Sequence, residues 1–217
     1  MHISLKNICP APLTEMLNTQ SQLTSEIWQS DVDFIKGKHY QINASSGKGK
    51  STFIHIIYGL RTDYTGEACI NQQSVLNISR KEWAMLRQQK IADIFQDLRL
   101  FSELTAWDNL QVKAVLQNEN MDHSIREMTA HLGVDHILNK KADLLSYGER
   151  QRIAIIRALC QPFEFILMDE PFSHLDKHNI EKACELIDHK CRLYQAGMIM
   201  TSLGYQYELQ FDEQLRL

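Results

Sequence analysis

The sequence lacks an apolar run long enough to cross a lipid bilayer, which takes about 20 residues as a helix. Its first residues, Met1–Lys6, lack the apolar stretch of a secretory signal peptide. A basic excess is also missing. The 217 residues carry a net charge of -4, with acids and bases mixed along the chain, which argues against a dedicated nucleic-acid binder. We therefore expect no nucleic-acid partner, and a role at a membrane only through another protein.

Paired cysteines are missing as well. The chain has 5 cysteines, an odd number, and no C-x-x-C pair; they are Cys9, Cys69, Cys160, Cys184 and Cys191. We expect reduced thiols in a cytosolic protein in preference to a disulfide framework or a zinc site. With 4 prolines, 9 glycines and 44% hydrophobic residues, the composition excludes a disordered or fibrous chain.

Strand-like apolar runs alternate with helical patterns, which favours an α/β fold. The expected strands are His39–Asn43, Glu67–Asn71, Ile91–Phe95, Phe163–Met168, Met198–Thr201 and Tyr207–Leu217. The expected helices are Ser51–Leu60, Arg80–Gln89, Ala106–Gln117, Gly148–Cys160 and Asn179–Tyr194. Thr105 is a plausible cap for the third helix, and the pattern stays helical from there to about Leu138.

A loop of small residues between an expected strand and an expected helix has the context of a phosphate-binding loop. Its residues are Ala44, Ser45, Ser46, Gly47, Lys48, Gly49, Lys50, Ser51 and Thr52. Such residues let successive N–H groups point at an anion, and the helix N-terminus adds partial positive charge. We expect Lys50 to reach the β- and γ-phosphates of a nucleoside triphosphate, most simply ATP, and Ser51 to bind Mg²⁺. The alternative is a flexible connector with a chance lysine.

Ala44 departs from the usual pattern G-x-x-x-x-G-K-[ST], because it replaces the first glycine. Alanine fits there if the backbone keeps a negative φ, and it is strained otherwise.

Two carboxylates, Asp169 and Glu170, follow the apolar run Phe163–Met168. Open α/β sheets bind their ligands at the carboxyl ends of the strands. Asp169 suits the shell of Mg²⁺, through water, and Glu170 suits a general base that polarises the attacking water. Alone, the pair would be read as a solvated strand end. Downstream of a phosphate loop, we prefer the metal ligand and the base.

Between these two features, Leu145–Arg152 reads LSYGERQR and resembles the L-S-G-G-[QE]-x-Q-R signature of ABC-type ATPases. Ser173–Asp176 resembles their D-loop, and Gln96 resembles the glutamine of their Q-loop. The motifs follow in the family's order and cover nearly the whole chain. The stretch Ser79–Gln96 looks most like the lipoprotein-release, macrolide-export and cell-division branch.

The resemblance implies a fold: a P-loop NTPase core with a mixed sheet and an inserted helical subdomain. One ABC ATPase domain then spans residues 1–217, with 1–96 and 149–217 as the α/β core and 97–148 as the helical subdomain. The insertion opens with the apolar run Leu98–Phe101. This run is either a surface that contacts a membrane partner or ordinary subdomain core.

The resemblance also implies ATP and Mg²⁺ as ligands and a head-to-tail homodimer or heterodimer with two ATP molecules between the subunits. The signature residues of one subunit would cap the γ-phosphate held by the other; they are Ser146, Tyr147, Gly148 and Glu149. Gln96 would contact Mg²⁺ and water, and Asp176 would act in the D-loop. Their plain alternatives are a polar strand end and a helix cap. A membrane-spanning permease subunit would hold the protein, which is otherwise cytoplasmic, at the inner face of the membrane.

Three departures from the family pattern concern the chemistry. Tyr147 replaces the first glycine of the signature. Ser202 stands where the family has a histidine that contacts the γ-phosphate, and losing a charge-assisted bond of roughly 1.5–3 kcal/mol slows catalysis about 10- to 100-fold. No aromatic residue precedes Trp28, so the family's stacking partner for adenine is missing, and we expect either loose base selectivity or weak affinity. His174 and His178 are interpreted as surface histidines.

The main prediction is an ATP-hydrolysing subunit of an ABC transporter, with Glu170, Gln96 and Ser202 at the reacting phosphate. The alternative is a nucleotide-binding regulatory switch with little turnover. Ser202, Ala44 and the missing aromatic residue favour it, and Glu170 opposes it. A soluble ABC ATPase of DNA repair or translation is a third reading. Such proteins usually carry coiled-coil arms or paired cassettes, and this chain has room for neither.

Overall fold

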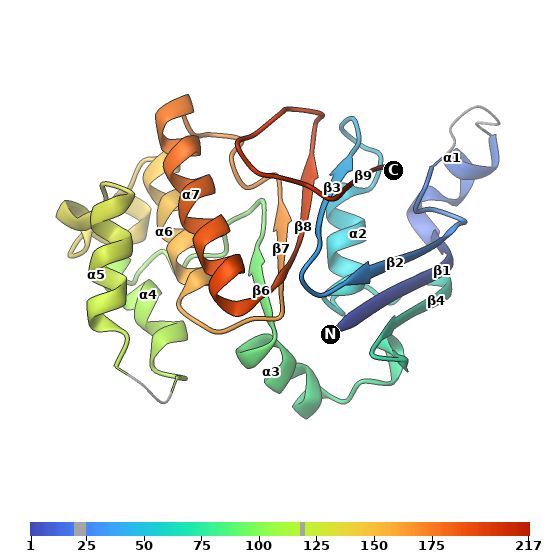
Figure 1. Ribbon diagram of the computed structural model, residues 1–217, viewed down its shortest axis with the longest axis horizontal. Coiled ribbons are helices and arrows are strands. Elements are labelled where there is room, and N and C mark those ends of the chain that lie inside the picture. Colours follow the sequence, from blue (N-terminus) through green and yellow to red (C-terminus); the bar gives the residue numbers. More distant parts are fainter. Residues whose placement is uncertain (20–24, 118–119) are drawn as a thin grey trace.

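Two sheets organise the chain in the computed structural model, which describes residues 1–19, 25–117 and 120–217 (Figure 1). One sheet is parallel, with the strand order β6-β7-β8-β3-β9. Its strands are β3 (His39–Asn43), β6 (Ile91–Ile94), β7 (Phe165–Asp169), β8 (Gly197–Ser202) and β9 (Glu213–Arg216). The other sheet is antiparallel, with the order β2-β1-β4-β5. Its strands are β1 (His2–Pro10), β2 (Asp31–Ile35), β4 (Tyr64–Ile70) and β5 (Gln73–Ser74).

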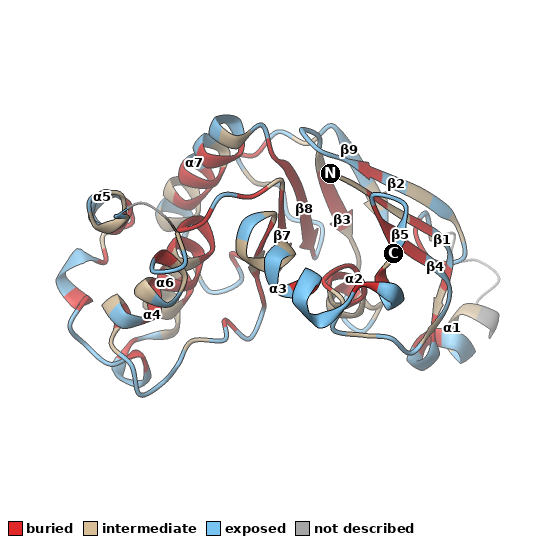
Figure 2. Cartoon of the chain, turned by 90° about the horizontal axis from the view of Figure 1, so that it is seen from below, coloured by how far each residue is buried: buried red, intermediate tan, exposed pale blue. Residues whose placement is uncertain are grey.

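Helices cover both faces of the parallel sheet, so its central strands are buried (Figure 2). Side chains alternate between the faces. Phe165 and Leu167 of β7 join a core with α2 (Lys50–Ile57) and the antiparallel sheet. Ile166 and Met168 point the other way, into a core with α6 (Tyr147–Leu159) and α7 (Lys177–Tyr194).

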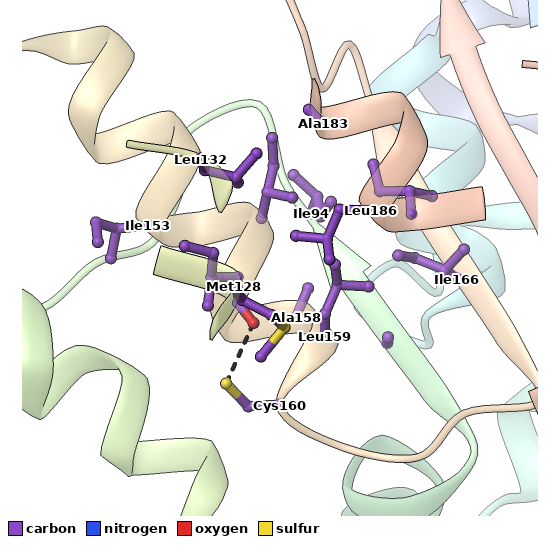
Figure 3. Close-up of a cluster of buried hydrophobic side chains, with 14 of the residues drawn as sticks. Ile94, Met128, Leu132, Ile153, Ala158, Leu159, Cys160, Ile166, Ala183 and Leu186 are labelled. Atoms are coloured by element: carbon purple, nitrogen blue, oxygen red, sulfur yellow. Dashed lines mark hydrogen bonds between the residues drawn. The ribbon is translucent and has the colours of Figure 1, made fainter. Parts of the chain in front are cut away.

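The second core also anchors the helices between β6 and β7. Figure 3 shows Met128 and Leu132 in the same hydrophobic cluster as Leu159 of α6 and Ile166 of β7. The helices of this region are α4 (Ala106–Ala114) and α5 (Asp122–His131), at the end of the molecule away from the antiparallel sheet (Figure 1). The other two helices are α1 (Thr14–Thr19) and α3 (Arg80–Gln89).

Several boundaries differ from the expected ones. The helix expected at Ser51–Leu60 ends at Ile57, and the one expected at Gly148–Cys160 begins at Tyr147 and ends at Leu159. Only Glu213–Arg216 of the strand-like run Tyr207–Leu217 pairs in a sheet. The expected helix Ala106–Gln117 ends at Ala114.

Side chains cap several of the described helices, and two of these caps, Thr105 and Asp176, are ones that the sequence indicates. Thr105 caps α4 by accepting from the amide of Asp108. Asp176 caps α7 by accepting from the amide of Asn179 at 2.9 Å, and this hydrogen bond lowers the pKa of the Asp176 carboxyl. Ser146 caps α6 in the same manner.

The described residues contain no helix that is both long and apolar enough to cross a membrane, and all five cysteines are free thiols.

Candidate functional site

The loop between β3 and α2 lies at the carboxyl edge of the parallel sheet and has the conformation of an anion cradle. Gly47 and Gly49 have φ of 80° and 97°, a region that L side chains rarely adopt. A Cβ on Gly49 would also lie 2.6 Å from Leu13 Cδ1 and 3.2 Å from Trp28 Cζ2. Ala44 is not among the described residues with positive φ, so alanine replaces the usual glycine there without backbone strain.

Lys50 closes this loop. Its side chain is 5% exposed, and Nζ donates to the carbonyl oxygens of Ala44 at 2.8 Å and Ser45 at 3.0 Å. The same Nζ lies 3.3 Å from Glu170 Oε1. The ammonium thus joins the phosphate loop to the acidic end of β7, two segments far apart in sequence.

The two carboxylates after β7 have different surroundings. Asp169 is 2% exposed, and its Oδ1 accepts from the Thr201 hydroxyl at 2.6 Å. Glu170 has φ of 48° immediately before Pro171, where a left-handed backbone is disfavoured. Its amide donates to Thr201 Oγ1 at 3.2 Å. A strained backbone at a carboxylate is a common mark of a functional site.

A cavity of about 250 Å³ brings the predicted site residues together. It is lined by Leu13, Ser46, Gly47, Gly49, Lys50, Ser51, Thr52, Gln96 and Glu170. Asp169 lies behind it, buried against Thr201. A larger cavity of about 620 Å³ lies beside Phe172 and Tyr207, but no glycine-rich loop lines it.

Ser202 does not line the cavity. It is 1% exposed, and its Oγ accepts from the amides of Gly204 at 3.1 Å and Tyr205 at 3.2 Å. The hydroxyl therefore holds the turn after β8. His174 and His178 do not line the cavity either. The ring of His174 lies against Tyr147, and its Nδ1 bonds Ser173 Oγ at 2.8 Å.

The signature segment forms the first turn of α6, away from the cavity lining of its own chain. Ser146 Oγ accepts from the amide of Glu149, and the Glu149 carboxylate accepts from the Ser146 amide and hydroxyl, both at 2.7 Å. These bonds from Ser146 lower the pKa of the Glu149 carboxyl. The first amides of α6, including that of Gly148, have no partners within the helix, as at any helix start.

The run Leu98–Phe101 divides between interior and surface. Leu98 is 5% exposed and belongs to the interior, whereas Phe101 is 53% exposed. Leu98 and Arg99 both have left-handed backbones, and their carbonyl oxygens each accept from Arg157 of α6 at 2.7 Å. Core packing thus accounts for Leu98, whereas Phe101 lies at the surface.

Trp28 supports the phosphate loop from the inside. Its ring is 2% exposed, lies edge-on to Phe53, and donates from Nε1 to the Lys48 carbonyl at 3.3 Å. No face of Trp28 is open to a nucleotide base. The described side chain that enters the cavity from the segment before β2 is Leu13.

A model of the ABC transporter family matches residues 28–173, more than half of the chain. The matched range contains the phosphate loop, Gln96, the signature turn and the two carboxylates.

The chain belongs to the ABC transporter family.

Solved structures of ABC cassettes share its fold. The dimeric structure of MJ0796, a bacterial ABC transporter cassette, matches with a TM-score of 0.76 and 26% identity, over 92% of this chain and 87% of that one. A dimeric post-hydrolysis structure of the same cassette, bound to ADP and Pi, matches with a TM-score of 0.75 and 25% identity, over 92% of this chain and 87% of that one. CbiO1 from Clostridium perfringens, part of the ABC transporter complex cbiONQ, matches with a TM-score of 0.66 and 21% identity, over 92% of this chain and 77% of that one. The expected fold is therefore confirmed: this is the P-loop fold of an ABC ATPase cassette, with its parallel and antiparallel pairings in two separate sheets.

In this ABC cassette, two residues contribute to the site that the sequence analysis did not identify, Thr201 and Leu13. Thr201, which bonds Asp169 and Glu170, carries no motif of its own, although its polar type at the end of a buried strand was a usable signal. Leu13 gave no signal, because an apolar residue after a strand is ordinary.

Proposed function

We propose that the chain binds ATP with Mg²⁺, hydrolyses it, and works as the ATPase subunit of an ABC membrane transporter. The observation that carries the proposal is the meeting of Lys50 with Glu170 at a cavity that also holds Gln96 and the phosphate loop. One small cavity is thus lined by a cation for the phosphates, by a carboxylate that can act as a base, and by the polar side chain of Gln96. Membership of the ABC transporter family supports the same assignment.

The residues present fit the nucleotide phosphates. The two left-handed glycines leave backbone amides and no side chains facing the cavity, and Lys50 needs only to exchange its carbonyl and carboxylate partners for phosphate oxygens. The phosphate-binding set is Ala44, Ser45, Ser46, Gly47, Lys48, Gly49, Lys50, Ser51 and Thr52. Ser51, Gln96 and Asp169 would hold Mg²⁺, which supplies charge neutralisation on the phosphate oxygens.

Glu170 is the proposed general base, and Gln96 the residue that orients the attacking water. Ser202, expected beside them, does not line the cavity and instead holds the turn after β8. Its hydroxyl is engaged with two amides, so it supplies none of the charge that the family's histidine brings. We therefore propose a working but slow ATPase.

Two subunits would complete the site in a head-to-tail homodimer or heterodimer. The first turn of α6 presents free amides and a positive helix end, which suits the γ-phosphate held by the second subunit. The capping residues would be Ser146, Tyr147, Gly148 and Glu149, with Asp176 in the adjoining D-loop. Both structures of MJ0796 are described as dimeric, which supports this arrangement.

A membrane-spanning permease is the proposed partner, and it would hold the cytoplasmic subunit at the inner face of the membrane. Phe101 offers an exposed apolar side chain in the insertion for that contact. The relative cbiO1 is described as part of a transporter complex. We keep the lipoprotein-release, macrolide-export and cell-division branch as the proposed placement within the family. Coexpression with a multi-span permease encoded beside this gene should move the chain to membranes; retention in the soluble fraction would contradict the partnership.

Nucleotide binding and hydrolysis can be tested with two variants. Lys50→Ala should abolish the rise in Tm that Mg-ATP produces, because it removes the phosphate-binding cation. Glu170→Gln should bind ATP, hydrolyse it at least about 100-fold more slowly and accumulate as a dimer in size-exclusion chromatography, because the base is lost and the charge at the interface falls. Lys81→Ala and Glu185→Gln, at exposed positions on α3 and α7, are the matched controls. If neither ATP nor ADP protects the native chain from thermal unfolding, the proposal is wrong.

The second candidate is a nucleotide-binding switch with little turnover, and the engagement of the Ser202 hydroxyl with its own turn favours it. Ser202→His separates the two. For a switch, turnover of the native chain is near background and the histidine raises it. Turnover at the rate of typical enzymes, about 1 per second or more, would exclude the switch.

A further inference from the structure

Tyr147, the residue that replaces a signature glycine, makes a contact that glycine cannot make. It is the first residue of α6, and its hydroxyl donates to the main-chain carbonyl of Gln96 at 3.0 Å. The two residues are 51 positions apart in the sequence. The bond therefore joins the signature turn directly to the residue that lines the phosphate cavity.

The ring of Tyr147 has two close neighbours. Its centroid lies 4.0 Å from that of the His174 ring, in the D-loop segment, and 5.2 Å from the Arg150 guanidinium. The main chain below is fixed by the reciprocal bonds of Ser146 and Glu149. A side chain restrained in this way can transmit a displacement of the helix start to the atom it bonds.

The Gln96 side of the bond is equally tied to α6. Arg157, in the last turn of the same helix, donates to the carbonyl oxygens of Leu98 and Arg99. The loop after β6 is thus bonded to both ends of one helix. Gln96 follows α6 through Tyr147, and the two residues beyond Asp97 follow it through Arg157.

We infer that Tyr147 is a positioning residue, which places Gln96 in the cavity of its own subunit according to where the start of α6 lies. This inference rests on the proposed function, in which the start of α6 faces the nucleotide of the second subunit. A nucleotide bound there attracts the start of α6, and the displacement reaches Gln96 through the Tyr147 hydrogen bond. The side chain couples the two nucleotide sites of the dimer, so its loss affects turnover and cooperativity but not the nucleotide affinity of one subunit.

Tyr147→Phe removes the hydroxyl and keeps the ring on its neighbours. We expect the turnover of the full chain with Mg-ATP to fall about 3- to 10-fold, the range for loss of one hydrogen bond, and the Hill coefficient for ATP to fall toward 1. At protein concentrations too low for dimers, the affinity for ATP should stay within about 2-fold of that of the native chain. The order of the variants by Tm should not change. Amide hydrogen exchange in residues 96–99 should become faster.

Tyr64→Phe is the matched control, because the Tyr64 hydroxyl is buried without a partner in the part of the chain that the structure describes. It should change none of these readouts. Unchanged turnover and unchanged exchange in Tyr147→Phe would overturn the inference, as would an ATP affinity that falls as much as turnover, since that marks a direct nucleotide contact. If the native chain binds no nucleotide, the proposed function fails, and the exchange of residues 96–99 still decides whether Tyr147 holds Gln96.

Discussion

Thr201 shows how one hydroxyl can organise two carboxylates with separate tasks. Its Oγ1 donates to Asp169 and accepts from the amide of Glu170, so the same oxygen sets the position of the proposed metal ligand and of the proposed base. The register of the sheet makes this possible, because Thr201 on β8 lies opposite Asp169 on β7. No local sequence pattern around Thr201 predicts this role, because the hydrogen bonds form only when β7 and β8 lie side by side in the sheet.

Thr201→Val keeps the shape of the side chain and removes the hydroxyl. We expect turnover with Mg-ATP to fall about 10- to 100-fold, because a hydrogen bond to a charged carboxylate is worth roughly 1.5–3 kcal/mol. The assay is steady-state phosphate release, compared with Thr129→Val, a buried threonine of α5 whose hydroxyl bonds a helix carbonyl. Equal losses in the two variants would show that the effect is one of stability alone.

At the scale of the element, α6 joins the parts of the site that the sequence separates. Its first turn carries the signature, Tyr147 bonds the loop after β6, and Gln151 bonds both Pro171 and His174 beyond the acidic strand end. The core behind it is made by Ile153, Ile156 and other buried residues on the face toward the sheet.

The caps of α6 and α3 offer a matched pair of variants. Ser146 and Ser79 each form the same reciprocal capping box with a glutamate three residues later. Ser146→Ala and Ser79→Ala should each lower the free energy of unfolding by about 1 kcal/mol, measured by urea titration. Only Ser146→Ala should weaken the ATP-dependent dimer, measured by sedimentation. A dimer weakened equally by both would contradict the placement of the signature turn at the nucleotide.

His55, on α2, links the stability of its helix to pH. Burial, followed by the nearby Arg99 guanidinium, lowers the pKa of His55 below its ordinary value near 6.5. The folded state therefore resists a proton that the unfolded chain takes up, so stability is complete above about pH 6.5 and declines as pH falls through that value. The Tm of the native chain should drop between about pH 7 and pH 5 more than that of His55→Gln. The exposed His136→Gln should behave like the native chain; equal pH profiles for all three would contradict this account.

The sequence predicts the elements that carry dense local signals and misses those that do not. The expected helix Arg80–Gln89 has its observed bounds, and the phosphate loop and signature lie where their motifs indicate. The strands β1 and β2 were not anticipated. The pairing of β1 with β4 shifts register between Lys6 and Cys9, and Asn7 there has a left-handed φ, which breaks the alternation on which strand prediction depends. β9 is short because it is defined by its pairing with β3, which involves only Glu213–Arg216, and a local sequence pattern does not show this pairing.

At the scale of the whole molecule, two hydrophobic cores share one parallel sheet. The core on the α2 side supports the phosphate loop, and the core on the α6 side supports the signature and the helices between β6 and β7. Because adjacent residues of β7 point into different cores, this one strand takes part in the packing behind both halves of the site. Four of the five cysteines lie buried in these packed regions or at their edges.

Thiol reactivity can report the integrity of the whole fold. Burial raises the pKa of Cys160, Cys184 and Cys191 to about 12, and Cys69 is also buried with a raised pKa. With Ellman's reagent near pH 7.5, we expect one thiol, that of Cys9, to react readily in the native chain, and all five in denaturant. Removing reductant should leave the Tm unchanged. Rapid reaction of several thiols in the native chain would contradict the packing described here.

The ion pair between Lys50 and Glu170 means that this protein carries its own competitor for the substrate. In the proposed mechanism, Lys50 must leave Glu170, the base that would activate the attacking water, before it can bind a phosphate, and the two could pair again once the products leave. On that proposal, the ion pair keeps the carboxylate of Glu170 occupied between turnovers, and nucleotide binding releases it by taking Lys50 as a partner.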